Sequence, residues 1–151
     1  MIGSILRGAA AGTAALNAAT YLDLAVRGRP SSSTPEDTVD RLAEKAGVPV
    51  PGEGEERANR VSGLGALMGI ATGVAVGVGY GLLRELGWRP SVPVGALVTT
   101  AGAMAGANAP MGALGVTDPK RWSATDWLSD ALPHLAYGLT TAATYAAMRR
   151  R

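Results

Sequence analysis

Residues 65–81, GALMGIATGVAVGVGYG, carry a glycine at every fourth position, although glycine inside a helix costs about 1 kcal/mol relative to alanine in water. The uncharged run 61–83 lies between Arg60 and Arg84 and, as a helix, is long enough to cross a hydrocarbon core of about 30 Å. Small and large side chains also alternate over 73–81, which fits a strand. A lone strand in lipid would leave its backbone groups unpaired, whereas a helix satisfies them internally. We therefore predict a transmembrane helix with a groove for another helix, formed by Gly65, Gly69, Gly73, Gly77 and Gly81.

Three further apolar segments follow a similar pattern, in which runs rich in Ala, Gly, Val and Leu end at charged residues. Trp88, Trp122 and Trp127 fall near segment ends, where indole rings favour the membrane–water boundary. Asn17 interrupts the first apolar run, so we do not expect that run to be a cleaved signal peptide. The sequence predicts an all-α integral membrane bundle, a single transmembrane domain over 1–151 with spans at about 2–26, 61–83, 94–114 and 127–148.

The connector between the first two spans, residues 27–60, is polar and contains a predicted short amphipathic helix at 35–46. Thr34 is the expected N-cap, and Gly47 the expected end of the helix. Two roles for this helix stay open, a solvated connector that rests on the membrane surface and a helix that docks a partner. Its apolar stripe would consist of Val39, Leu42, Ala43 and Ala46.

Composition excludes several classes of function. The chain has 151 residues, a formal net charge of +2 and no cysteine, which excludes disulfides, thiol chemistry and a cysteine-based metal site. The basic residues stand at segment ends and form no stripe interleaved with aromatic residues, so we expect no nucleic-acid partner. Their distribution between the two predicted membrane sides leaves the orientation of the chain open.

The last predicted span carries most of the polar chemistry. Asp130 and His134 lie about one and two turns inside it, where ionisable groups are costly and usually face the bundle interior or a water-filled cavity. Pro133 is expected to kink the helix beside His134. Asn17 in the first span and Asn108 in the third are potential partners. The spacing of three and four residues places on one helical face Asp126, Asp130, His134, Tyr137, Thr141 and Tyr145.

Three interpretations of this face stay open: hydrogen bonds between helices, the handling of protons or cations, and the binding of a ligand or cofactor. A single histidine makes a haem site a poor expectation, zinc ligands are lacking, and the chain has neither a phosphate-binding loop nor a nucleophile motif. We therefore expect no enzyme activity, no cofactor and no metal. The candidate proton or ion path comprises Asp126, Asp130, His134, Tyr137, Asn17 and Asn108.

The order of these features resembles the YagU-like family of small bacterial inner-membrane proteins. The likeness lies in GVGYGLLRELGWRPSVPVGAL, then PMGALGVTDPKRW, then SDALPHLAYG, in which an acid stands four residues before a histidine. It covers residues 61–148, whereas the first span matches only in outline and the connector lacks the family's longer insertion. The resemblance implies a four-span, multi-pass protein of the bacterial plasma membrane with a link to acid tolerance. It would assign any acid response to Asp130 and His134, since histidine titrates near pH 6.5 when unperturbed.

The sequence thus favours a non-enzymatic membrane protein with a structural or regulatory role through glycine-mediated helix packing, linked to acid or envelope stress. Its expected partners are the lipid bilayer and either further copies of the chain or another membrane protein. A proton- or ion-conducting protein that uses the polar face of the last span is the alternative, and a membrane enzyme or small-lipid binder is a third class.

Overall fold

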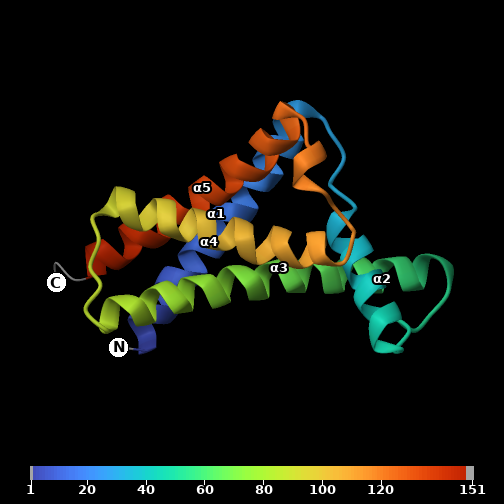
Figure 1. Ribbon diagram of the computed structural model, residues 1–151, viewed down its shortest axis with the longest axis horizontal. Helices are drawn as coiled ribbons and strands as arrows, with labels where there is room; N and C mark the ends of the chain where they lie inside the picture. The colour runs from blue at the N-terminus through green and yellow to red at the C-terminus, as the bar shows by residue number, and fades with distance from the viewer. Residues whose placement is uncertain (1, 149–151) are drawn as a thin grey trace.

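The computed structural model describes residues 2–148, and every regular element in that range is helical (Figure 1). The all-α class is therefore confirmed, and the strand alternative for 73–81 is wrong. The helices are α1 (Ile2–Arg27), α2 (Thr34–Ala46), α3 (Gly54–Glu85), α4 (Val92–Ala113) and α5 (Ala124–Met148), and a short 3-10 turn, η1, covers Pro119–Arg121.

The four long helices run alternately in opposite directions. In Figure 1, α1 and α5 lie together as one antiparallel pair, and α4 lies beside α5 above the long α3. The α3–α4 loop lies at the same end of the bundle as the beginning of α1 and the end of α5, and α2 lies at the other end. The most extensive contacts join α5 to α1 and α4, followed by those of α1 with α3. Helix α5 is thus the element on which the bundle is assembled.

Helix α2 forms where the sequence predicts it, with one correction at its start. The helix begins at Thr34, and the N-cap position is Ser33 rather than Thr34. Gly47 ends it in the left-handed conformation with φ of 66°, which glycine adopts without steric cost. Val39 is buried whereas Leu42 is exposed, so only part of the predicted apolar stripe packs on α3.

The core of the bundle contains small residues, threonines and tyrosines. Tyr80, Ala96, Ala142 and Tyr145 form one buried cluster, and Tyr137 is fully buried. Most of the large aliphatic side chains lie on the outside instead, although Ile5, Val39 and Val61 are buried. Leu16, Leu24 and Leu114 are half-buried, and every other leucine is exposed.

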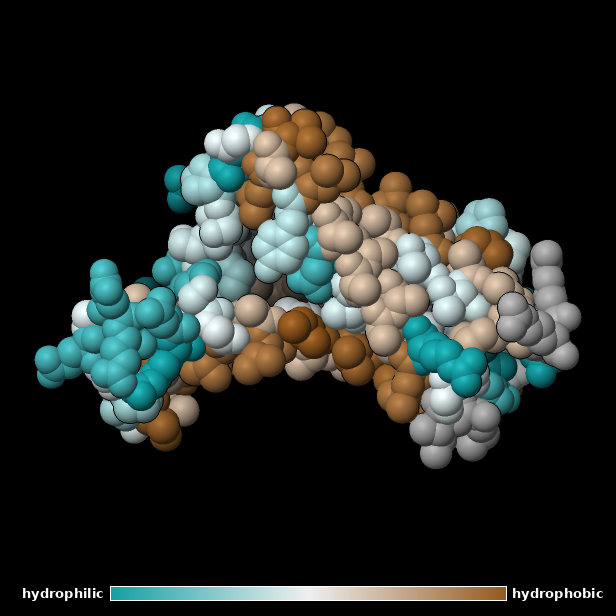
Figure 2. All heavy atoms as spheres, turned by 180° about the vertical axis from the view of Figure 1, so that it is seen from behind, coloured by the Kyte–Doolittle hydropathy of each residue, from teal (hydrophilic) through white to brown (hydrophobic). Residues whose placement is uncertain are grey.

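Polar and apolar surfaces are separated along the bundle. Figure 2 shows hydrophilic side chains gathered around α2, at the opposite end of the molecule and along the edge above α2, with hydrophobic side chains along the bottom of the view between the two ends and at its top. Within residues 2–148, α3 is the one helix whose length and hydropathy suit it to cross a membrane. The other long helices contain charged residues, in α1 and α5, or two prolines and an asparagine, in α4. The four-span arrangement therefore stays a prediction.

Candidate functional site

Four of the five glycines on this face of α3 lie against another helix, and three different helices are involved. Gly73 and Gly77 approach Thr13 and Ala9 of α1, and a Cβ atom at Gly77 would stand 2.6 Å from the Ala9 Cα. Gly81 faces the Tyr145 hydroxyl of α5, and Gly65 faces Pro35 of α2. Gly69 has no neighbouring atom within 4 Å of such a Cβ and is exposed. The glycine face is therefore covered by the chain's own helices except at Gly69.

Two buried tyrosines of α5 connect the helices through backbone carbonyls. The Tyr137 hydroxyl donates to the Gly73 carbonyl oxygen at 2.7 Å. The Tyr145 hydroxyl lies 2.7 Å from the Ile5 carbonyl oxygen and 3.0 Å from that of Gly77. The Tyr145 hydroxyl of α5 is therefore within hydrogen-bond distance of a carbonyl on α1 and of one on α3, so the three helices meet at this residue. Glycine makes these contacts possible because no Cβ shields the carbonyl or keeps the ring away.

Helix α1 supplies a second glycine pair for the same two tyrosines. A Cβ at Gly8 would overlap the Tyr145 ring, and a Cβ at Gly12 would overlap Thr141 and lie 3.0 Å from the Tyr137 ring. The pair GAAAG at 8–12 carries little information as an isolated motif. Its importance arises from the two tyrosines that face it, which lie eight residues apart on α5 and so on one helical face.

Three residues of the predicted polar path come together between α4 and α5. The Asn108 side-chain nitrogen donates to the Asp130 Oδ2 at 2.9 Å. The His134 Nδ1 lies 2.7 Å from the Asp130 backbone oxygen and 3.5 Å from its carboxylate. The His134 and Asp130 side chains are 12% and 19% exposed, so both are largely shielded. We call these three residues the Asn–Asp–His cluster.

The other residues of the predicted path lie elsewhere. Asn17 donates to the Thr13 carbonyl of its own helix at 2.9 Å, and Tyr137 bonds to Gly73 as described. Asp126 is exposed and forms a capping box, in which its carboxylate accepts from the Ser123 amide and hydroxyl while Ser123 Oγ accepts from the Asp126 amide. The hydrogen bonds from the Ser123 hydroxyl and amide lower the pKa of Asp126.

The Asn–Asp–His cluster has the chemistry of a proton acceptor next to a proton donor. A proton on His134 Nδ1 would be held by the Asp130 backbone oxygen, and Nε2 would then be left as the basic nitrogen. The Asn108 amide fixes one carboxylate oxygen of Asp130. Within the described part of the chain, no group of three or more His, Asp or Glu side chains is placed to hold a metal ion.

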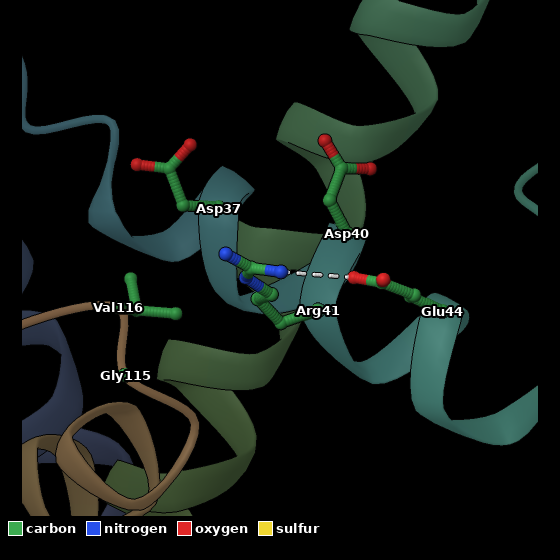
Figure 3. Close-up of a pocket in the computed structure, with 6 residues that line it drawn as sticks. All are labelled: Asp37, Asp40, Arg41, Glu44, Gly115 and Val116. Carbon is green, nitrogen blue, oxygen red and sulfur yellow. Dashed lines mark hydrogen bonds and ion pairs between the residues drawn. The ribbon is translucent and has the colours of Figure 1, made fainter.

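One further cavity, of about 360 Å³, lies between α2 and the 114–118 loop (Figure 3). Its charged groups form two ion pairs, Arg41 with Glu44 at 3.0 Å and Asp40 with Arg57 at 2.6 Å, and Asp37 accepts a hydrogen bond from the Ser33 hydroxyl. Paired, exposed charges of this kind contribute little to binding or stability. The cavity is lined by Asp37, Asp40, Arg41, Glu44, Gly115 and Val116.

Comparisons of the chain with protein-family models, with curated proteins and with solved structures gave no match.

The two glycines Gly77 and Gly69 provide a matched test of the packing. Gly77→Ala places a methyl group against the α1 backbone and should lower the free energy of unfolding by about 1–3 kcal/mol, as overpacking does. Gly69→Ala meets open space and should leave stability unchanged or raise it by up to about 1 kcal/mol. Unfolding in detergent micelles, followed by circular dichroism, measures both. Equal effects at the two positions would contradict the assigned packing.

Asn108 and Asn17 provide a similar pair for the polar cluster. Asn108→Ala removes a hydrogen bond to a shielded carboxylate and should cost about 1.5–3 kcal/mol of unfolding free energy. Asn17→Ala removes a bond within a single helix and should cost less than about 1 kcal/mol. Chemical denaturation of the two variants beside the unsubstituted protein gives the comparison. A larger loss for Asn17→Ala would show that Asn108 does not connect α4 to α5.

Proposed function

We propose that the chain is a four-span integral membrane protein with a non-enzymatic, structural or regulatory role. The observation that carries this proposal is the outward position of the leucines, none of which is buried. In water, Leu is among the residues most often buried, and a bundle of this size would place it in the core. In lipid there is no hydrophobic penalty for leucine outside, and helices associate through small residues and interhelical hydrogen bonds.

The composition of the interior supports the same proposal. The contacts between helices are made by Gly, Ala and Thr and by buried tyrosine hydroxyls, which is the kind of interface that bilayer helices use. Hydrophilic side chains gather around α2 and at the opposite end of the molecule (Figure 2). A bacterial plasma membrane and a role in acid or envelope stress rest on the YagU-like resemblance and belong to the proposal.

The glycine contacts favour a self-contained bundle over a homo-oligomer held by the glycine face. Gly65, Gly73, Gly77 and Gly81 already contact residues of the same chain. A second copy could reach only Gly69 without displacing α1, α2 or α5. We therefore propose that the glycines position the chain's own helices, and that any membrane partner contacts the lipid-facing aliphatic surface.

A lysine scan of two exposed leucines tests the membrane proposal. Leu139 lies within α5 and is 47% exposed, whereas Leu86 follows α3 and is 84% exposed. In lipid, Leu139→Lys should cost about 2.5–3.5 kcal/mol and reduce the amount of protein recovered in the membrane fraction. Leu86→Lys, at the end of a span, should have little effect. In a water-soluble bundle both changes would stay within about 0.5 kcal/mol, so equal recovery of the two variants would contradict the proposal.

The Asn–Asp–His cluster favours proton or small-ion conduction as a second candidate function. Asp130 and His134 are in contact at a shielded position between two helices, where a buried carboxylate and imidazole usually mark a proton or ion route. The cluster would be the central exchange point. The path predicted from the sequence is not continuous beyond it, because Tyr137 and Asn17 bond elsewhere.

Proton flux into liposomes that contain the purified protein tests this candidate. Asp130→Asn removes the titratable carboxylate and should reduce flux to the level of empty liposomes. Asp126→Asn changes an exposed capping residue and should leave flux unchanged, which makes it the matched control. Absence of flux in the unsubstituted protein, or equal flux in both variants, would remove conduction from consideration.

A further inference from the structure

A small cavity of about 130 Å³ lies at the end of the bundle opposite α2, where α3 ends and α1 begins. Two arginines contribute to it, Arg84 and Arg89, together with one acid, Glu85. The cavity is lined by Ser4, Arg84, Glu85, Arg89, Tyr145 and Met148.

Arg84 is the unusual member of this lining because it is 8% exposed and has no carboxylate partner. The ion pairs within residues 2–148 all involve other residues. Its Nη1 donates to the Tyr80 hydroxyl at 3.0 Å, whereas its buried Nε has no acceptor. A buried charge without a counter-ion and with an unused donor is costly. An anion bound beside the guanidinium would supply the missing counter-ion.

The surroundings fix the guanidinium in place. Its carbon lies 5.6 Å from the centre of the Tyr80 ring, within the range of a cation–π contact. Trp88 packs edge-on against the same ring at 5.9 Å, and Tyr145 does so from another side at 5.5 Å. The Tyr80 ring therefore holds the Arg84 guanidinium, and Trp88 and Tyr145 in turn hold the Tyr80 ring. Arg84 lines the cavity from this fixed position, which is the preorganised state that reduces the cost of binding.

We propose that this cavity binds a phosphate group, with Arg84 as the principal ligand and Arg89 as a second cation. The planar guanidinium donates paired hydrogen bonds that match phosphate oxygens. The two arginines exceed the single Glu85 in charge, so the lining attracts an anion. Two sources share this chemistry, the headgroup of an anionic phospholipid and free inorganic phosphate. The lipid source rests on the proposed membrane location, under which Trp88 would lie at headgroup depth.

The test measures phosphate binding in two media. The first is a vesicle of phosphatidylcholine with or without phosphatidylglycerol, after which native mass spectrometry counts the lipid retained by the protein. The second is a titration of the detergent-solubilised protein with inorganic phosphate, monitored by the fluorescence of Trp88, with Trp122 and Trp127 replaced by Phe. Arg84→Gln removes the guanidinium, Arg84→Lys keeps the charge without the planar fork, and Arg121→Gln is an exposed arginine at the far end of the bundle.

We expect retention of phosphatidylglycerol to fall about tenfold or more in Arg84→Gln, because charged hydrogen bonds are lost, and to be unchanged in Arg121→Gln. This result supports a lipid site. The same pattern with inorganic phosphate alone supports a free-phosphate site, even if the chain does not enter vesicles. Equal binding by Arg84→Gln and the unsubstituted protein, or no binding in either medium, overturns the proposal. If Arg84→Gln fails to fold, Arg84→Lys replaces it in the test. Unchanged circular dichroism then shows that this variant is folded, and reduced binding supports the proposal.

Discussion

The bundle depends on the contact between tyrosine rings of α5 and glycine surfaces on α1 and α3. Tyr145 places its ring on Gly8 and its hydroxyl within hydrogen-bond distance of carbonyls on both neighbouring helices. Tyr137 repeats the arrangement two turns earlier, with its hydroxyl on Gly73. Each ring occupies the space that a Cβ would fill and uses a carbonyl that a side chain would cover. The helix spacing is therefore set by glycine, and the helix register by the tyrosine hydroxyls.

Tyrosine rings packed on glycine fill the interior, and the leucines lie on the surface. The leucines that would form the core of a water-soluble bundle lie outside, and this outward position is the basis of the proposed membrane location. Some of the polar groups that remain inside are paired across helices, as Asn108 is with Asp130, whereas Thr13 and Thr38 bond to carbonyls of their own helices. Among the described residues, three buried side-chain atoms lack a hydrogen-bond partner, the Glu36 Oε2, the Thr141 Oγ1 and the Nε of the charged Arg84.

The four long helices were predictable because apolar runs end at charged residues, although α3 begins at Gly54 and so continues through the charged residues before the apolar run 61–83. The contacts of single residues were less accessible. Asp126 shares a face with Asp130, yet it caps α5, and the sequence SATD at 123–126 carries the signal for that role. In the sequence, Arg84 marks the end of an apolar run. In the structure it is buried and donates a hydrogen bond to Tyr80, one turn earlier. Which glycine faces which tyrosine depends on helix register, and no local pattern encodes that.

Whether the exposed leucines face lipid or water tests this account most directly. The chain has no cysteine, so Leu97→Cys on α4 and Leu139→Cys on α5 each introduce one site for a nitroxide spin label. In vesicles, collisions with molecular oxygen and with a water-soluble nickel chelate report lipid and water respectively. We expect oxygen to dominate at both positions and the nickel chelate to dominate at Leu86→Cys. Preferential contact with the nickel chelate at Leu97→Cys and Leu139→Cys would place these surfaces in water and contradict the account.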